Sequence, residues 1–241
     1  KGHVTTKERI AKLFGKGQES ATNNLTSEQK EIVGTRLNPG ESLVVEAGAG
    51  SGKTTCMIEL ARALPPTAKV LYICFINKGA AEAREKYRRA GIDNTHACTV
   101  HSLASRTTAL YEKAGKFQTR ITVKDIQKHQ ACTRRRAWEI LETIKRFCES
   151  AHKIPTAEDT RMIRSATEEE RAEVVQEAQK MWEKMIDPNH PAPVSYDQYL
   201  KVFELTDPTL PYDYILADEA QDSNPVTLNL LEKQRERSRI I

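Results

Sequence analysis

The segment Ala47-Gly48-Ala49-Gly50-Ser51-Gly52-Lys53-Thr54 decides how this sequence is interpreted. It follows the apolar run Leu43–Val45 and precedes a helical pattern that begins near Thr54. Glycine allows backbone N–H groups to approach an anion closely, and a helix N-terminus favours negative charge. Lys53 can reach the outer phosphates of a nucleotide, and the Thr54 hydroxyl can ligate Mg²⁺. The order of strand, glycine-rich turn and helix therefore predicts a phosphate-binding loop, although alanine replaces glycine at its first position.

The length suits one large α/β domain or one domain with an insertion, and the composition suggests long, solvated helices. The 241 residues are 39% hydrophobic and 29% charged, with a net charge of +4 that permits nucleic-acid binding without requiring it. The five cysteines form no C-x-x-C pair, so we expect neither a disulfide framework nor a structural metal. The longest apolar run, Val70–Ile76, is too short to cross a membrane. We expect an intracellular protein with no membrane partner.

Strands and helices are expected to alternate along most of the chain. We predict strands at Ser42–Glu46, Val70–Phe75, Thr95–Val100 and Tyr214–Ala217. We predict helices at Leu25–Leu37, Thr54–Leu64, Gly79–Ala90 and Ser102–Lys113. This alternation is typical of an α/β fold with a doubly wound parallel sheet.

Residues 121–186 interrupt the alternation because they contain no convincing strand. We expect two amphipathic helices, Arg134–Ala151 and Ala166–Ile186, the second capped by Ser165 with Glu168. Trp138 and Trp182 are expected to pack inside this helical part.

We therefore expect four segments along the chain. They are an N-terminal arm (1–24, a short helix or a loose segment), the first part of an α/β domain (25–118), a helical insertion (119–195) and the second part of the α/β domain (196–241).

The acidic segment Asp218-Glu219-Ala220-Gln221-Asp222 follows the last predicted strand. The carboxyl ends of parallel strands meet at one edge of the sheet, so we expect this segment beside the phosphate loop. Asp218 is then placed to hold the Mg²⁺ that Thr54 also contacts. Glu219 is placed to accept a proton from an attacking water, which makes it the expected catalytic carboxylate.

The phosphate loop and the acidic segment, with three further motifs in order, resemble the UvrD-like group of superfamily-one DNA helicases, and within it the F-box DNA helicases. The three motifs are Leu25-Thr26-Ser27-Glu28-Gln29, Phe75-Ile76-Asn77-Lys78-Gly79-Ala80-Ala81 and Thr99-Val100-His101-Ser102. The resemblance covers about residues 25–115 and 190–235. It implies a RecA-like P-loop NTPase sheet with an inserted helical subdomain, so residues 25–118 and 196–241 would form the motor domain, and residues 119–195 its insertion.

The resemblance also implies the ligands and the residues that bind them. ATP and Mg²⁺ are the implied cofactors, with Gln29 recognising adenine. The implied catalytic residues are Lys53, Glu219 and Gln221, of which Gln221 senses the γ-phosphate. The implied nucleotide-binding set is Gln29, Ala47, Gly48, Ala49, Gly50, Ser51, Gly52, Lys53, Thr54 and Thr55. The residues implied to line a single-stranded DNA path are Phe75, Asn77, Lys78, Thr99, His101 and Ser102.

Several of these residues also have an ordinary structural interpretation. Gln29 completes a capping box with Thr26, Phe75 ends a buried strand, and Asn77 is a suitable helix N-cap. Ser102 is similarly suited to cap a helix. The basic residues Arg134–Arg136 and Lys145–Arg146 either guide nucleic-acid phosphates or form a solvated helix face.

We therefore expect a motor domain that hydrolyses ATP and moves along single-stranded DNA. The chain ends before the G-D-x-x-Q motif of the family, so we expect the second RecA-like domain and its arginines to be missing. This predicts a weak ATPase that does not unwind DNA alone, located in the nucleus if the source is a eukaryote. The alternatives are a nucleic-acid-binding or adaptor module, an RNA-directed motor, and an enzyme that transfers phosphate to a small molecule.

Overall fold

The computed structural model describes residues 8–13, 25–48, 50–74, 77–163 and 166–241. The chain divides into two compact units. The α/β unit comprises Lys1–Val100, Thr209–Ser223 and Leu231–Ile241, and the helical unit comprises His101–Pro208 and Asn224–Leu230. The predicted division at residues 118 and 195 stays a prediction.

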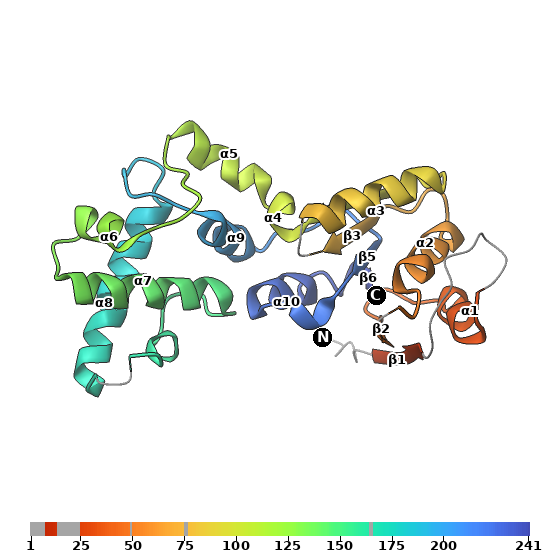
Figure 1. Ribbon diagram of the computed structural model, residues 1–241, viewed down its shortest axis with the longest axis horizontal. Helices are drawn as coiled ribbons and strands as arrows, with labels where there is room; N and C mark the ends of the chain where they lie inside the picture. Colours follow the sequence, from red (N-terminus) through yellow and green to blue (C-terminus); the bar gives the residue numbers. More distant parts are fainter. Residues whose placement is uncertain (1–7, 14–24, 49, 75–76, 164–165) are drawn as a thin grey trace. The chain divides into compact units, whose positions relative to one another are not determined.

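The α/β unit contains a six-stranded sheet in which all paired strands are parallel. The strands are β1 (Glu8–Leu13), β2 (Ser42–Ala47), β3 (Val70–Cys74), β4 (Thr95–Thr99), β5 (Tyr214–Ala217) and β6 (Arg239–Ile240). Their spatial order is β1-β2-β6-β5-β3-β4. All of them except β4 are labelled in Figure 1. Helices α1 (Ser27–Gly34), α2 (Lys53–Ala63) and α3 (Asn77–Arg89) connect successive strands. The predicted α/β fold with a parallel sheet is confirmed.

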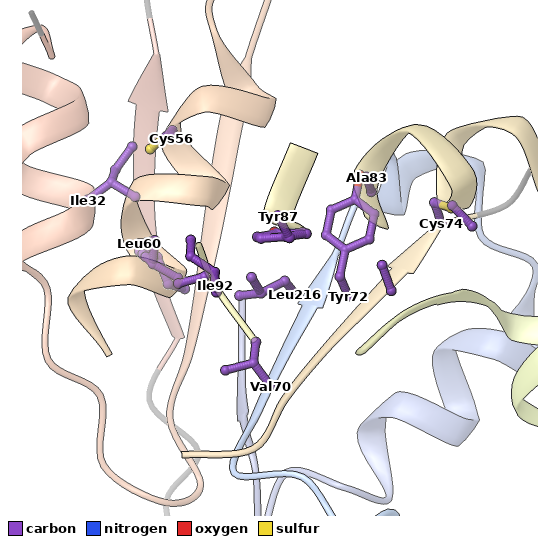
Figure 2. Close-up of a cluster of buried hydrophobic side chains, with 14 of the residues drawn as sticks. Ile32, Cys56, Leu60, Val70, Tyr72, Cys74, Ala83, Tyr87, Ile92 and Leu216 are labelled. Carbon is purple, nitrogen blue, oxygen red and sulfur yellow. The ribbon is translucent and has the colours of Figure 1, made fainter. Parts of the chain in front are cut away.

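Strand β3 is buried along its whole length, as expected for a parallel strand covered on both faces. Its alternate residues Val70, Tyr72 and Cys74 belong to one hydrophobic cluster with residues of α1, α2 and α3 (Figure 2). Leu216 of the neighbouring strand β5 belongs to the same cluster. This core fixes the carboxyl ends of β3 and β5, and the acidic segment follows directly after β5.

The helical unit is built around the long helices α7 (Arg134–Glu149) and α8 (Glu168–Ile186). The rings of Phe147 and Trp182 meet edge to face, with centroids 5.0 Å apart, which joins the two helices. The unit also contains the short helices α5 (Ser105–Lys113), α6 (Val123–His129), η1 (Ala157–Thr160) and α9 (Tyr196–Leu205). Two further short elements, α4 (Val100–Leu103) and α10 (Pro225–Glu232), run across the boundaries between the units.

Three sequence predictions about local structure were wrong. Residues 8–13 form strand β1 rather than part of a helix or loose arm, because they pair in register with β2. The single helix predicted at Ser102–Lys113 is two helices, α4 and α5, separated at the fully buried Ala104. Helix α8 begins with a capping box of Thr167 and Glu170, so Glu168 is its first residue rather than its box partner, and Ser165 lies outside the described residues.

The prediction that both tryptophans are buried was half right. Trp182 is buried, whereas Trp138 is 44% exposed. Trp138 follows Ala137, which lies on the buried face of α7 with Leu141 and Ile144. At about 100° per residue, Trp138 lies about 60° beyond Leu141, which is at the edge of the buried arc, so Trp138 falls outside that face.

Candidate nucleotide-binding site

The phosphate loop joins the end of β2 to the start of α2. Gly50 and Gly52 both have left-handed backbone conformations, with φ of 72° and 84°, which a residue with a Cβ adopts only at a cost. Gly52 is the N-cap of α2 and contributes no side-chain cap, and the N–H groups of the first helical turn have no partners within the helix. The N-terminus of α2, which begins at Lys53 and includes Thr54 and Thr55, therefore suits an anion. Ala49 lies outside the described residues.

Gln29 fixes the phosphate loop from the start of α1. Its side-chain Oε1 accepts a hydrogen bond from the Thr26 N–H at 3.1 Å, which completes the predicted capping box. Its Nε2 donates to the Ser51 carbonyl at 3.1 Å. The adenine contact of Gln29 stays a prediction, whereas its bond to the loop was not foreseen because 22 residues separate the partners.

The acidic segment meets the phosphate loop at the same edge of the sheet. The Lys53 Nζ lies 3.0 and 3.1 Å from the two carboxylate oxygens of Glu219. The side chains of Lys53 and Glu219 are 30% and 44% exposed, so the pair remains open to solvent and to exchange of partners. The structure thus brings together Lys53 and Glu219, which are 166 positions apart. Gln221, the third residue predicted as catalytic, also donates a hydrogen bond to Glu219.

Glu219 has a backbone conformation that the sequence did not predict. Its φ of 53° and ψ of 42° are left-handed, which is uncommon for a residue other than glycine. Such conformations cost on the order of 1–3 kcal/mol and concentrate at functional sites. A hydrogen bond from Gln221 Nε2, and secondly one from Lys53, lower the pKa of the Glu219 carboxyl below its ordinary value. The carboxylate is therefore ionised at neutral pH, as a proton acceptor must be.

Asp218 is held through both of its carboxylate oxygens. Its Oδ1 accepts the Glu219 N–H at 3.1 Å, and its Oδ2 accepts the hydroxyl of Tyr72 on the neighbouring strand β3. Burial first, and then the bond to Asp218, raise the pKa of the Tyr72 hydroxyl far above its ordinary value. Tyr72 therefore remains a neutral donor. In the sequence, Tyr72 lies within the apolar run Val70–Ile76, and its hydroxyl is the one sign of a polar role there.

The chemistry of these residues fits a nucleotide phosphate with a divalent cation. The loop supplies two left-handed glycines and a lysine, and the acidic segment supplies two carboxylates. Within the described part of the chain, the buried Ser51 Oγ has no hydrogen-bond partner, although it belongs to this loop. A Mg²⁺ ion accompanying nucleotide phosphates needs only one or two protein oxygen ligands, which Thr54 and Asp218 would supply.

The residues predicted to contact DNA are divided between the two units. In the α/β unit, Asn77 and Lys78 are exposed at the start of α3, and the Lys78 ammonium lies 3.8 Å from Glu82. Asn77 is the first helical residue, whereas position 76 lies outside the described residues, as does Phe75. Thr99 ends β4 and is buried.

In the helical unit, His101 lies on α4 with Ser102. The His101 ring meets the rings of Tyr196 and Tyr199 edge to face, at centroid distances of 6.1 and 6.2 Å. Its Nε2 lies 3.8 Å from the Asp197 carboxylate. His101 is thus partly exposed beside an aromatic cluster that the sequence did not predict.

The basic residues of α7 are largely paired within the helical unit. Arg135 lies 2.9 Å from Glu139, Arg136 lies 3.0 Å from Glu173, and Lys145 pairs with Glu142. These pairs favour the interpretation of this segment as a solvated helix face over that of a phosphate guide.

Comparison with known proteins is consistent with this arrangement. The family described as "UvrD/REP helicase N-terminal domain" matches residues 25–239. The chain is 30% identical over 250 residues to "F-box DNA helicase protein 1" of Schizosaccharomyces pombe, covering 94% of this chain and 28% of the relative. It is 27% identical over 232 residues to "F-box DNA helicase 1" of Gallus gallus, covering 87% of this chain and 22% of that relative.

The chain therefore spans between a fifth and a third of the length of these curated relatives. None of the described helices is both long and apolar enough to span a membrane. The family match extends over both the phosphate loop and the acidic segment. The chain belongs to the UvrD-helicase family, within the part that forms the N-terminal domain.

Proposed function

We propose that this chain is the ATP-hydrolysing motor domain of a DNA helicase that moves along single-stranded DNA. The observation that carries the proposal is the approach of Lys53 to Glu219 at 3.0 Å, because it unites the phosphate loop and the acidic segment at one sheet edge. Membership of the UvrD-helicase family and the names of the two relatives support the same function.

Each residue of the site has a distinct proposed role. Backbone N–H groups from Gly48 to Thr55 and the Lys53 ammonium bind phosphate oxygens, and Gln29 keeps the loop in place while recognising adenine. Thr54 and Asp218 hold Mg²⁺, which neutralises charge on the phosphates when it is bound. When Lys53 turns to phosphate, the Glu219 carboxylate is released to orient a water molecule and accept its proton. Gln221, already bonded to Glu219, senses the γ-phosphate.

The proposed DNA path uses residues that follow β3 and β4. Lys78 is a solvent-exposed cation for backbone phosphates, and Asn77 and Ser102 supply polar contacts. Phe75 and His101 are proposed to contact bases, and an aromatic ring stacked on a base contributes about 1–3 kcal/mol. Thr99 is buried, so its proposed contribution is to position this segment. A DNA substrate implies the nucleus as the location in a eukaryote.

The proposed ATPase is weak in this chain alone. In the resembling helicases, arginines of a second RecA-like domain contact the γ-phosphate, and such arginines contribute about 10³–10⁵-fold to kcat in related enzymes. We therefore expect slow hydrolysis and no unwinding by the 241-residue chain.

The test is phosphate release from ATP by this chain with and without single-stranded DNA. A motor domain predicts hydrolysis that rises when DNA is added. Hydrolysis that is indifferent to any nucleic acid but rises with a small-molecule acceptor would contradict the proposal, and so would DNA binding without any hydrolysis, which indicates an adaptor. Competition between DNA and RNA of one sequence at fixed salt tests the substrate, and stronger stimulation by RNA would indicate an RNA-directed motor.

A further inference from the structure

Tyr72 lies one strand away from the carboxylate that is proposed to hold Mg²⁺. Strands β3 and β5 are paired with Tyr72 opposite Leu216, and Asp218 follows Leu216 by two residues. Asp218 is the first residue after the end of β5. The Tyr72 hydroxyl reaches the Asp218 Oδ2 from the neighbouring strand.

The Tyr72 ring is held rigidly by the core. It is 3% exposed and packs edge to face against the ring of Tyr87 on α3, with centroids 5.7 Å apart (Figure 2). Ala83 of the same helix lies in the same cluster. A side chain packed in this way has little freedom to rotate, so the position of its hydroxyl is fixed by the fold.

The bond from Tyr72 determines the orientation of the Asp218 carboxylate. The Glu219 N–H binds Oδ1 and the Tyr72 hydroxyl binds Oδ2, so rotation of the carboxylate breaks at least one of these bonds. Each carboxylate oxygen has two lone pairs, so each retains one for another partner. A neutral phenol also leaves the negative charge of Asp218 available, whereas a lysine or arginine in its place would neutralise that charge.

We propose that Tyr72 is a positioning residue for the Mg²⁺ site, acting through the orientation of Asp218. The inference rests on the proposed function, because it assigns Asp218 to the metal. Hydrogen bonds to metal-binding carboxylates orient the ligand, and their removal commonly lowers metal affinity about 10–100-fold.

The test compares Tyr72→Phe with Tyr87→Phe. Each substitution removes one hydroxyl from a buried ring and keeps the ring itself. Among the residues that the structure describes, the Tyr87 hydroxyl has no hydrogen-bond partner, so its removal breaks no hydrogen bond to Asp218. Binding of a fluorescent ATP analogue is measured against Mg²⁺ concentration and again in EDTA, and binding of Mn²⁺ is followed by the loss of its free electron paramagnetic resonance signal.

We expect Tyr72→Phe to raise the Mg²⁺ and Mn²⁺ concentrations for half-saturation about 10-fold or more, while nucleotide binding in EDTA is unchanged. Tyr87→Phe should behave as the unmodified chain. Equal metal dependence in Tyr72→Phe and the unmodified chain would overturn the role of Tyr72 alone. An equal loss in both variants would also overturn it, because a general effect on packing would explain the loss. Absence of any metal-dependent nucleotide binding by the unmodified chain would overturn the proposed function as well.

Discussion

Two lysine–glutamate pairs with nearly the same bond length have opposite surroundings in this molecule. In the α/β unit, Lys53 and Glu219 are 3.0 Å apart with side chains 30% and 44% exposed. In the helical unit, Lys201 and Glu204 are 2.9 Å apart with side chains 0% and 2% exposed. The distance alone therefore does not distinguish an ion pair of a functional site from a structural ion pair. The burial of each pair and its other hydrogen bonds do distinguish them.

The buried pair of α9 has further partners from α7, with its C-cap Ser150, and from α10. Lys201 Nζ also donates to the Ser150 carbonyl at 3.0 Å and lies 4.9 Å from the centroid of the Phe147 ring. Glu204 accepts a further hydrogen bond from Asn229 Nδ2. Such a network is specific to one arrangement of helices, because each charge depends on its partners in the low-dielectric interior.

Breaking the buried pair should have the largest effect. We expect Lys201→Met to lower the free energy of unfolding by about 3–5 kcal/mol, because Glu204 is left charged and buried without its cation. Denaturant titration followed by tryptophan fluorescence measures this directly, since both tryptophans, Trp138 and Trp182, belong to the helical unit.

The matched control is Lys145→Met. Lys145 pairs with Glu142 at the same spacing of three residues but is 43% exposed, so its loss should cost about 0–1 kcal/mol. Equal destabilisation by the two substitutions would contradict the distinction between buried and exposed pairs.

Breaking the exposed pair should affect chemistry rather than stability. We expect Lys53→Ala to lower the rate of ATP hydrolysis about 10²–10³-fold, the typical effect of removing one preorganised donor from a developing negative charge. Unfolding followed by circular dichroism should change by less than about 1 kcal/mol, because the pair is solvent-exposed. If Lys53→Ala kept full hydrolysis but lost much of its stability, the Lys53–Glu219 pair would be structural rather than functional, which would contradict this account.

The smallest expected effect concerns the protonation of Glu219. Its pKa is lowered chiefly by Gln221 and secondly by Lys53, so its stabilising contribution is present above the ordinary carboxyl pKa and is lost as the pH falls through the folded pKa. Gln221→Ala should therefore move the pKa upward, toward the ordinary value. Carbon NMR of the Glu219 carboxyl against pH measures the shift, and an unchanged or lower pKa would show that Gln221 does not hold this carboxylate.

The parts of the fold and site that could be predicted from the sequence are those that depend on local residue patterns. The parallel strands β2, β3 and β5 and the phosphate loop follow from apolar runs and from glycines beside Lys53. The approach of the acidic segment to the loop follows from the rule that parallel strands end at one edge. These inferences need no knowledge of individual tertiary contacts.

The features that sequence analysis missed depend on contacts between distant residues. Strands β1 and β6 belong to the sheet because their backbones pair with β2 and β5. Backbone pairing of this kind gives little recognisable pattern of apolar and polar side chains in the sequence. Tyr72 is a core residue by pattern, and its bond to Asp218 appears only once β3 lies beside β5. Lysine is a residue type that is mostly exposed to solvent, so the sequence gives no sign that Lys201 is buried. Only the packing of α9 shows this.

Calorimetric titration of the chain with the slowly hydrolysed analogue ATPγS, in Mg²⁺ and then in EDTA, tests the central claim most directly. If Lys53 and Asp218 serve one nucleotide at one sheet edge, binding occurs at a single site, Mg²⁺ strengthens it, Lys53→Ala weakens it in both buffers, and Asp218→Asn removes only the strengthening by Mg²⁺. Absence of binding heat in the unmodified chain, or an Asp218→Asn variant that responds to Mg²⁺ like the unmodified chain, would contradict the account.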